Sequence, residues 1–428
     1  MNTSAITSLL SRWRSDVNIG GNIVAWETIP ARQPQYEPFP SDLHSALGNA
    51  LRASGIRALY SHQMHAWELA RSGANLALAT DTASGKTLAY NLPILDCLLR
   101  EPQSRALYLF PTKALAQDQI AGLRSLLAHI PHAETPIAPA AYDGDTPQSA
   151  RPAIRQNARL IISNPDMLHI GILPRHAAWA DFFANLRYVV IDEMHIYRGV
   201  FGSHVANVVR RLKRIAKFYD AQPQFILTSA TIGNPRQLAE KLIEAPLTLI
   251  DSDGSGRGPK HFLIYNPPIV DEELGLRASM LAESVRLAED IYAYGIQTIL
   301  FGRTRRSVEV MLRYLAAAIG ERTPQSVRAY RSGYLPAHRR EIEAGLRSGS
   351  VRTVVATTAL ELGIDLGGMG PPSRPGTRAR LPEAGSKPGA QGVAWRHRSQ
   401  CWWPHPIQPI NFWRAIQIIS LAAVRNAP

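Results

Sequence analysis

The stretch NLALATDTASGKT, residues 75–87, decides the fold class of this chain of 428 residues. Its first half is apolar and has the length of a buried strand, and its second half leads into an expected helix start. Such a loop points backbone N–H groups at phosphates, Lys86 can reach the outer phosphates, and the Thr87 hydroxyl can ligate Mg²⁺. A chance GKT at a helix start is the competing interpretation, because Gly85 is the loop's only glycine and Thr80 stands where Gly or Ala is usual.

Similar apolar runs recur around this stretch, separated by longer helical patterns. Each run is continuous rather than alternating, which is typical of strands buried on both faces of a parallel sheet. The runs cover residues 75–80, 105–111, 158–165, 186–193 and 224–231. We therefore predict a doubly wound α/β domain over residues 51–250.

The rest of the chain divides by composition. Residues 1–50 carry four prolines, Pro30, Pro34, Pro38 and Pro40, and are predicted to be an irregular lead-in. The glycine-rich polar stretch DSDGSGRGPK predicts a linker over residues 251–271. A shorter alternation then predicts a second, partial α/β domain over residues 272–369. Its expected elements are a helix near 277–294, a strand at 297–302, a helix near 305–319 and a strand at 352–358.

Composition also bounds where the protein works. The longest apolar runs are far shorter than the about 20 residues that span a bilayer, and the first residues lack the pattern of a signal peptide. Cys97 and Cys401 are the only cysteines, which excludes a disulfide framework and a four-cysteine zinc site. We expect a cytoplasmic protein without a membrane partner and without structural zinc.

The net charge of +13 mildly favours a polyanionic partner. More than half of it comes from residues 370–428, which hold eight Lys and Arg residues against one acid, Glu383. The same segment holds nine of the 31 prolines and four of the eight tryptophans. Composition therefore changes abruptly after Met369.

Two more motifs follow predicted strands. DEMH, Asp192–His195, places two adjacent acids at the carboxyl end of a buried strand, which is costly unless they serve a site there. Asp192 would hold Mg²⁺ through its water shell, and Glu193 would polarise an attacking water. A solvated strand end is the alternative. SAT, Ser229–Thr231, ends the next strand and means little by itself.

The ordered set of motifs resembles helicase superfamily 2. Within it the chain resembles the bacterial mitomycin repair factor A type of DEAD/DEAH-box DNA helicase, over about residues 40–369. The segments that carry the resemblance are LYSHQ (59–63), the GKT loop, PTKALAQDQ (111–119), YDGDTP (142–147), NPDMLH (164–169), DEMH, SAT, RGPKHFLIYNPP (257–268), TILFGRTRRSVE (298–309), YRSGYLPAHRREIE (330–343) and ATTALELGID (356–365).

The resemblance implies roles at the nucleotide. Gln63 would read the adenine edge, because an amide offers donor and acceptor together. Gly363 and Asp365 would approach the nucleotide when the two domains close. The expected phosphate-loop residues are Thr82, Ala83, Ser84, Gly85, Lys86 and Thr87. Catalysis is assigned to Glu193, Asp192 and Lys86, and Mg²⁺ to Thr87 and Asp192.

The resemblance also implies a path for a nucleic-acid strand. His195, Ser229 and Thr231 would link the ATP site to that path. The expected backbone contacts are Pro111, Thr112, Lys113, Asn164 and Pro165 in the first domain, and Arg303, Thr304 and Thr358 in the second. Such contacts bind phosphates without reading sequence. A structural role stays open for Asn164 and Thr304, and a solvated helix start for Arg305 or Arg306.

One family motif is absent from this reading frame. The family closes its second domain with QxxGRxGR, whose arginines reach the γ-phosphate, a contribution on the order of 10³–10⁵ in rate in related enzymes. With each codon's third base free, AGSKPGAQGV (384–393) read in a shifted frame permits WQQAGRAGR, and residues around 376–378 permit GYPGT. We hypothesise that the frame slips just after Met369. Residues 370–428 are then expected to be an aberrant, disordered tail, and ATTALELGID to lie beside an unpaired sheet edge.

The sequence thus predicts a superfamily 2 ATP-dependent DNA helicase or translocase. Its fold would be two RecA-like P-loop domains with parallel sheets, the second incomplete, and its cofactors ATP and Mg²⁺. The partner would be single-stranded or duplex DNA. RNA stays open as a partner, since the motifs imply contacts to the phosphate backbone and none to the sugar. Loss of the arginine motif predicts impaired hydrolysis. The alternatives are a non-catalytic nucleic-acid-binding remnant, an RNA helicase and, leaving most motifs unexplained, a kinase.

Overall fold

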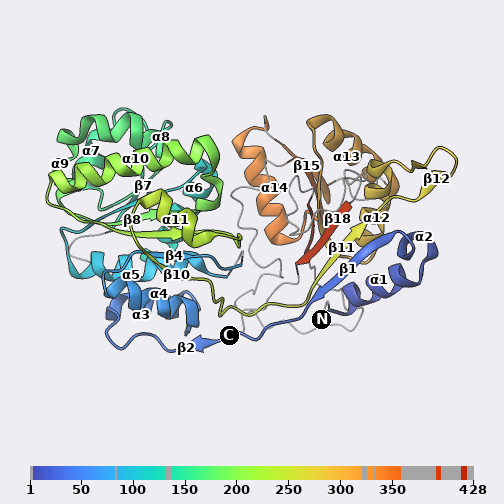
Figure 1. The fold of residues 1–428 in the computed structure, drawn as a ribbon, viewed down its shortest axis with the longest axis horizontal. Helices are drawn as coiled ribbons and strands as arrows, with labels where there is room; N and C mark the ends of the chain where they lie inside the picture. Colours follow the sequence, from blue (N-terminus) through green and yellow to red (C-terminus); the bar gives the residue numbers. More distant parts are fainter. Residues whose placement is uncertain are drawn as a thin grey trace, which may run out of the picture. The chain divides into compact units, whose positions relative to one another are not determined.

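The computed structural model describes residues 3–81, 84–130, 137–320, 325–331, 333–357, 392–396 and 416–421. These residues divide into two compact units (Figure 1). The first unit is Gln33–Gly256, and the second unit joins Met1–Arg32 to Arg257–Ala427. Each unit is an α/β structure with its own sheet, as the sequence predicts.

The first unit is built on a seven-stranded sheet whose order is β10-β4-β9-β8-β5-β7-β6. Every neighbouring pair in it is parallel. The strands are β4 (Leu76–Leu78), β5 (Arg105–Leu109), β6 (Pro139–Ala141), β7 (Leu160–Ser163), β8 (Leu186–Ile191), β9 (Gln224–Thr228) and β10 (Thr248–Ile250). The five predicted apolar runs all contain strands; β6 and β10, at the two sheet edges, were not predicted.

Helices cover both faces of this sheet, which explains why its strands are apolar throughout. One face packs against α3 (Ser45–Ala53), α4 (Ser61–Arg71), α5 (Lys86–Arg100) and α6 (Lys113–Leu127). The other packs against α9 (Ala180–Ala184), α10 (Gly199–Phe218), α11 (Pro235–Ile243) and helical turns over Leu168–Ile172 and Leu173–Trp179. Shorter pieces are β2 (Tyr36–Glu37), β3 (Leu59–Tyr60), α7 (Arg151–Asn157), α8 (Pro165–Met167) and a turn over Met194–Ile196.

No helix within the described residues combines the length and apolar character that a membrane crossing requires.

The second unit also has a seven-stranded sheet, with the order β1-β11-β18-β17-β14-β16-β15. Its strands are β1 (Ile23–Ile29), β11 (Lys260–Tyr265), β14 (Gln297–Phe301), β15 (Val327–Tyr330), β16 (Thr353–Ala356), β17 (Gly392–Arg396) and β18 (Ile416–Leu421). Its helices are α1 (Thr3–Ser15), α2 (Val17–Gly20), α12 (Met280–Ala293), α13 (Arg305–Ile319) and α14 (Pro336–Ser348), and β12 (Ile269–Asp271) pairs with β13 (Leu276–Arg277). The predicted parallel sheet is correct only from β17 to β15, because β1, β11 and β18 run antiparallel to their neighbours.

The predicted irregular lead-in is wrong. Residues 3–29 form α1, α2 and β1, and β1 pairs with β11 in the second unit. Trp13 is 1% exposed in that unit's core, and its indole Nε1 donates a hydrogen bond to Asp290 at 3.0 Å. Burying this indole and the apolar face of α1 outweighs the irregularity that the four later prolines indicate.

Two boundaries also need correction. The predicted linker over 251–271 runs too far, because β11 already begins at Lys260 and is a central strand of its sheet. The expected unpaired edge at ATTALELGID is wrong for its described part, since β16 lies between β14 and β15. Within the predicted disordered tail, β17 and β18 are strands; for the remainder of residues 370–428 disorder stays a prediction.

Candidate nucleotide site and nucleic-acid path

The motif residues of the first unit gather at one edge of its sheet. The phosphate loop follows β4, and the motifs that begin at Pro111, Asn164, Asp192 and Ser229 follow β5, β7, β8 and β9. These five strands run parallel, so their carboxyl ends meet at one edge, where ligands of open α/β sheets bind. The fold therefore brings the predicted nucleotide and coupling residues of this unit together.

The phosphate loop ends at Gly85, immediately before α5. Gly85 has φ 82° and ψ 27°, a left-handed conformation that glycine adopts at little cost. A Cβ at this position would lie 2.6 Å from Nε2 of Gln63, so the loop has no space for a side chain here. The hydroxyls of Thr80 and Ser84, 2.7 Å apart, join the two ends of the loop.

Lys86 folds back over this loop. Its ammonium group donates hydrogen bonds to the backbone carbonyls of Thr80 at 3.0 Å and Asp81 at 2.9 Å. Burial lowers the pKa of Lys86, while the carboxylates of Glu193 and Asp192 act in the opposite direction. Both bonds go to neutral acceptors, and a phosphate oxygen would replace them with stronger charge-assisted bonds.

Asp192 lies at the end of β8 and is 8% exposed. Burial raises the pKa of its carboxyl to about 6, and the charge of Glu193 acts in the same direction. The hydroxyl of Thr228 donates a hydrogen bond to Asp192 Oδ1 and, with the Lys86 ammonium, favours the ionised form. A divalent cation beside a carboxylate has the same effect, so this acid suits Mg²⁺.

Thr87 is the other predicted Mg²⁺ residue, and its hydroxyl is also held in place. Gln119 on α6 donates from Nε2 to Thr87 Oγ1 at 3.4 Å, and the Tyr90 hydroxyl donates to Gln119 Oε1 at 3.3 Å. A hydroxyl oxygen has two lone pairs, so one remains available to a metal ion. Thr87 and Asp192 together therefore fit Mg²⁺ as a pair of oxygen donors.

Glu193 has an unusual backbone and a close charged neighbour. Its φ of 50° and ψ of 45° lie in the left-handed region, which is strained for a residue with a side chain. Its carboxylate Oε2 lies 3.1 Å from Nδ1 of His195. Burial raises the pKa of Glu193, but His195 and Lys86 lower it more, and the net shift is downward. The carboxylate is therefore ionised near neutral pH, as a group that orients or deprotonates water must be.

The SAT loop contacts both the DEMH motif and the phosphate loop. The backbone N–H of Ala230 points at His195 Nδ1 at 3.3 Å, and the Thr231 hydroxyl donates to Asp81 Oδ1 at 3.3 Å. Ser229 is buried; its hydroxyl donates to the Ala230 carbonyl at 2.6 Å, and its N–H donates to the Leu78 carbonyl at 2.8 Å. Of the three predicted coupling residues, His195 and Thr231 thus connect motifs through side chains, whereas Ser229 connects to β4 through its backbone.

Gln63 lies beside the phosphate loop rather than apart from it. Its Nε2 donates to the Gly85 carbonyl at 2.9 Å, and its Oε1 accepts from the Tyr60 N–H at 2.9 Å. An amide has two donor hydrogens and two acceptor lone pairs, so half of its capacity remains. Reading of adenine by Gln63 stays a prediction, and its bond to Gly85 is an additional, structural role.

The predicted nucleic-acid residues of the first unit mix structural and exposed groups. Thr112 and Asn164 each cap a helix: their side chains accept from the N–H groups of Leu115 at 3.3 Å and Met167 at 2.8 Å. The structural role left open for Asn164 is therefore present. Lys113 is half exposed and forms an ion pair with Asp145 at 2.6 Å.

The predicted residues of the second unit are only partly described. Thr304 caps α13, with its hydroxyl accepting from the Ser307 N–H at 3.0 Å, so its structural role is present as well. Arg303, Arg305 and Arg306 are exposed at the start of that helix. Five predicted residues lie outside the described ones: Thr82, Ala83, Thr358, Gly363 and Asp365.

Sequence reasoning missed three residues of this site. Thr228 bonds Asp192, Gln119 bonds Thr87, and Asp253 contributes to the field at Lys86. Gln119 lies in a motif that was quoted, and Thr228 directly precedes SAT, so position next to a motif was the available signal. Asp253 gave none, because it lies in the predicted linker.

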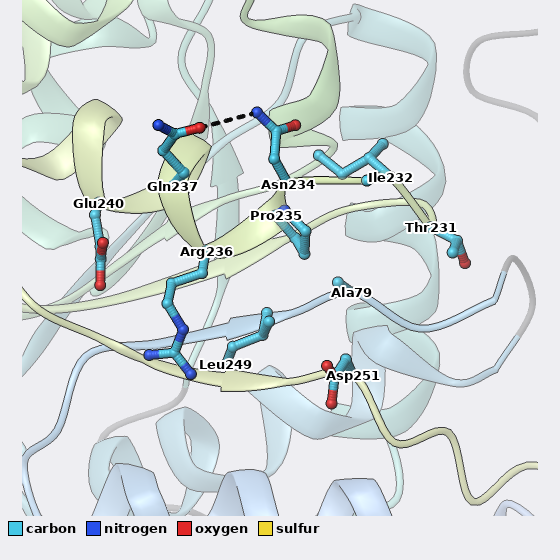
Figure 2. A pocket seen from close by; sticks show the side chains of 11 residues that line it. Ala79, Thr231, Ile232, Asn234, Pro235, Arg236, Gln237, Glu240, Leu249 and Asp251 are labelled. Carbon is cyan, nitrogen blue, oxygen red and sulfur yellow. Dashed lines mark hydrogen bonds between the residues drawn. The ribbon is translucent and has the colours of Figure 1, made fainter. Parts of the chain in front are cut away.

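A separate cavity of about 560 Å³ opens beside the SAT loop. Figure 2 shows its lining, with the side chains of Asn234, Gln237 and Arg236 from the start of α11 and Leu249 from β10. The acids Asp192 and Glu193 and the lysine of the phosphate loop do not line it. Thr231 is the one predicted site residue among its lining residues, so this cavity lies beside the predicted nucleotide residues and does not include the acids or Lys86.

Comparison with known proteins adds two family matches. The family described as DEAD/DEAH box helicase matches residues 60–238, and the one described as helicase conserved C-terminal domain matches residues 283–369. The second match ends at Met369, the residue after which the composition changes.

Curated relatives and solved structures agree with these matches. The chain is 46% identical over 368 residues to a protein named uncharacterized ATP-dependent helicase YprA of Bacillus subtilis (strain 168), covering 86% of this chain and 48% of the relative. It is 38% identical over 378 residues to the ATP-dependent helicase HRQ1 of Saccharomyces cerevisiae, covering 86% of this chain and 35% of the relative. A crystal structure described as the DUF1998 helicase MrfA bound to DNA is similar with a TM-score of 0.81 and 46% identity, covering 85% of this chain and 48% of that one. The chain thus spans about half the length, or less, of these relatives.

Proposed function

The chain belongs to the DEAD/DEAH box helicases, and from this membership we propose that it is the motor part of an ATP-driven DNA helicase or translocase, with the nucleotide held on the first unit. The observation that carries the proposal is the contact of three motifs at one sheet edge. The Ala230 N–H of the SAT loop donates to His195 of DEMH at 3.3 Å. The Thr231 hydroxyl of the same loop donates to Asp81 of the phosphate loop at 3.3 Å. A nucleotide and a strand bound at this edge would act on the same short chain of contacts.

The residues of the first unit divide the work. When bound, ATP supplies the scissile phosphate and Mg²⁺ supplies a Lewis acid. Lys86 would exchange its two loop carbonyls for phosphate oxygens, and Asp192 and Thr87 would hold the metal ion. Glu193, kept ionised by His195, would orient water and accept its proton on the carboxylate.

Coupling between ATP hydrolysis and a bound nucleic-acid strand would pass through the SAT loop. A phosphate backbone bound along the helix starts that begin at Lys113 and Pro165 would lie at the same edge of the sheet as Ala230 and Thr231. A shift of this loop would change the contacts of His195 and Asp81, and through them the water-orienting and phosphate-binding groups. DNA is proposed over RNA because the solved relative of 46% identity is described as bound to DNA.

Steady-state ATP hydrolysis with and without single-stranded DNA tests the proposal. We expect DNA-stimulated turnover that Lys86→Ala abolishes and Lys217→Ala preserves, since Lys217 is exposed on α10 away from the loop. DNA-stimulated turnover that is present and equal in the wild type and Lys86→Ala would contradict the assignment. Competition between DNA and RNA strands decides which nucleic acid the chain prefers. The ionic strength must be stated, because phosphate-driven affinity depends steeply on salt.

We further propose that turnover of this chain is low, because no QxxGRxGR motif is present in its sequence. A folded first unit that binds nucleotide and nucleic acid without coupled hydrolysis is the second candidate, and the absent motif is the observation in its favour. Tight Mg²⁺-dependent nucleotide binding with no DNA-stimulated turnover would select it. The expected cytoplasmic location, which rests on the low cysteine content, is tested by cell fractionation.

A further inference from the structure

We propose that Thr228 is a positioning residue for both acids of the nucleotide site and thereby sets the response of nucleotide binding to Mg²⁺. This inference rests on the proposed function, since it deepens the assignment of the same site. Thr228 is the last residue of β9 and is completely buried. It belongs to no motif that the sequence singled out.

The strand register places Thr228 beside Asp192. Ile191 of β8 pairs with Leu227 of β9, so the next residues of these parallel strands, Asp192 and Thr228, are also neighbours. On its other side Thr228 pairs with Leu78, the last residue of the strand that leads into the phosphate loop. Thr228 therefore lies between the strand that carries the acids and the strand that carries the phosphate loop.

Side-chain alternation then turns these groups to one face. Val190 and Ile226 belong to the core on the face that α5 covers, and residues two positions apart in a strand share a face. The side chains of Asp192 and Thr228 continue the same two rows at the carboxyl end of the sheet. They therefore lie on the face of the helix that begins with Lys86 and Thr87.

The hydroxyl of Thr228 serves both acids at once. It donates its hydrogen to Asp192 Oδ1 and accepts the backbone N–H of Glu193 at 3.3 Å. A hydroxyl has one hydrogen and two lone pairs, so the two roles are compatible in one orientation. The first bond fixes the rotation of the Asp192 carboxylate, and the second anchors the backbone of Glu193.

The second bond matters because Glu193 is strained. Its φ of 50° places a residue with a side chain in the left-handed region, and such conformations persist only where neighbours hold them. Without the Thr228 oxygen, the Glu193 N–H would lose the acceptor that holds this turn. The direction of the Glu193 carboxylate, and its approach to His195, would then be less defined.

The bond to Asp192 gives the effect on Mg²⁺. A carboxylate that holds a metal ion through its water shell must present a fixed oxygen, and loss of an outer partner of a metal-binding residue typically weakens metal affinity about 10- to 100-fold. Thr228→Val has nearly the same shape without the hydroxyl, so it isolates this contribution. Thr228→Ser retains the hydroxyl and loses one methyl group.

The test titrates Mg²⁺ into the full chain with a fluorescent ATP analogue. For Thr228→Val we expect the Mg²⁺ concentration at half-maximal binding to rise about tenfold or more, with binding in EDTA changed less than about twofold. Thr228→Ser should restore the wild-type midpoint. Thr298→Val is the matched control: Thr298 is also completely buried in a strand, but its hydroxyl bonds the Ile296 carbonyl, at 3.2 Å in the second unit, and lies far from both acids in the chain.

The outcomes separate the two proposals. A wild type without Mg²⁺-dependent nucleotide binding contradicts the proposed function and this inference together. A wild type that binds, with an unchanged midpoint in Thr228→Val, contradicts this inference alone, as does equal weakening with and without Mg²⁺. If Thr228→Val does not fold, Thr228→Ala takes its place; loss of folding in both variants makes Thr228 a folding residue and overturns the inference.

Discussion

The Nδ1 atom of His195 lies 3.1 Å from the Oε2 atom of Glu193, so two residues of one motif form a close polar pair at the end of β8. The same nitrogen accepts the Ala230 N–H of the neighbouring strand's loop at 3.3 Å when it carries no proton, so it bonds either Ala230 as an acceptor or Glu193 as a donor. One imidazole therefore contacts both the proposed water-orienting acid and the loop proposed to respond to nucleic acid. Any signal between the two sites in this unit has a short route through this ring.

Replacing this imidazole should uncouple hydrolysis from DNA. In His195→Ala we expect DNA-stimulated turnover to fall about tenfold or more, while nucleotide affinity changes by less than about twofold, because the lost contacts concern coupling and water rather than phosphate binding. His204→Ala, an exposed histidine on α10, is the control. The measurement is ATP turnover against DNA concentration. A weaker nucleotide affinity with intact stimulation would show that His195 acts at the phosphates instead.

Removing the charge of Asp192 should stabilise the metal-free protein. Burial raises the pKa of this carboxyl from 3.8 to about 6, so the folded state binds the proton more tightly than the unfolded state does. The stabilisation linked to that proton is complete below about pH 4 and is lost as the pH rises through about 6. Asp192→Asn carries no such loss, and its amide oxygen can still accept from Thr228.

We therefore expect the free energy of unfolding of Asp192→Asn to exceed that of the wild type by on the order of 1–3 kcal/mol at pH 7. This difference should shrink to near zero at pH 4. Thermal and urea unfolding in EDTA without nucleotide measures both. Asp166→Asn, an acid on α8 outside the acid pair, controls for general charge effects. A gain that is the same at both pH values would mean that the substitution acts through packing and not through the buried charge.

Gly85 should tolerate alanine less well than a second glycine with the same backbone. Gly85 and Gly73 have φ values of 82° and 79°, so each alanine meets a similar left-handed strain, of about 1–2 kcal/mol. A Cβ at Gly85 would also lie 2.6 Å from Gln63 Nε2, whereas nothing lies within 4 Å of one at Gly73. Gly85→Ala should therefore lose more stability and also weaken nucleotide binding, which Gly73→Ala should leave unchanged.

Unfolding curves and nucleotide titrations of the two variants, side by side, check this expectation. The double variant Gly85→Ala with Gln63→Ala removes the contacting amide and should recover part of the lost stability. Equal stability losses in the two single variants would mean that Gln63 moves aside freely and that its bond to Gly85 contributes little.

Local signals explain what the sequence predicted well. Helix α13 spans Arg305–Ile319 as expected, because Thr304 caps it and apolar residues recur at helical spacing. The five inner strands of the first unit's sheet were found because burial on both faces makes them continuously apolar. The motif residues at their ends could be placed at one edge because parallel strands end together.

The features that were missed depend on pairing between distant segments. Helix α1 was hidden by the prolines that follow it, although Ile6, Leu9 and Trp13 follow the spacing of a helical face. The position of β16 between β14 and β15 is set by strand order, which no single segment encodes. Thr228 became visible only through the register of β8 and β9, since its neighbour Asp192 is 36 residues away in the chain.

The N-terminal helix should stabilise the second unit and not the first. Trp13 is 1% exposed in the core formed by α1, α12 and α13, so Trp13→Ala should cost about 3–5 kcal/mol there. Hydrogen exchange resolved by segment should show faster exchange in α12 and β14, with α5 and β8 unchanged. Val17→Ala, at an exposed apolar residue next to α1, is the control. Uniform acceleration in both units would mean that they unfold together.

The ion pair between Lys113 and Asp145 should compete with a DNA strand. Both side chains are at least half exposed and lie 2.6 Å apart, and such surface pairs contribute at most about 1 kcal/mol, so a phosphate can displace the carboxylate. Asp145→Asn removes the competing charge, and its N–H can still bond Asp143 Oδ1 at 2.8 Å as in the wild type. We therefore expect Asp145→Asn to tighten single-stranded DNA binding by about two- to fivefold.

The variant Lys113→Ala should weaken single-stranded DNA binding for every sequence. It should also lower the magnitude of the slope of log K against log salt by about 0.7. Fluorescence anisotropy over a salt series measures both quantities, with Lys241→Ala, on α11, as the control. An unchanged salt slope in Lys113→Ala would place the strand elsewhere, because a phosphate contact cannot be lost without releasing fewer counterions.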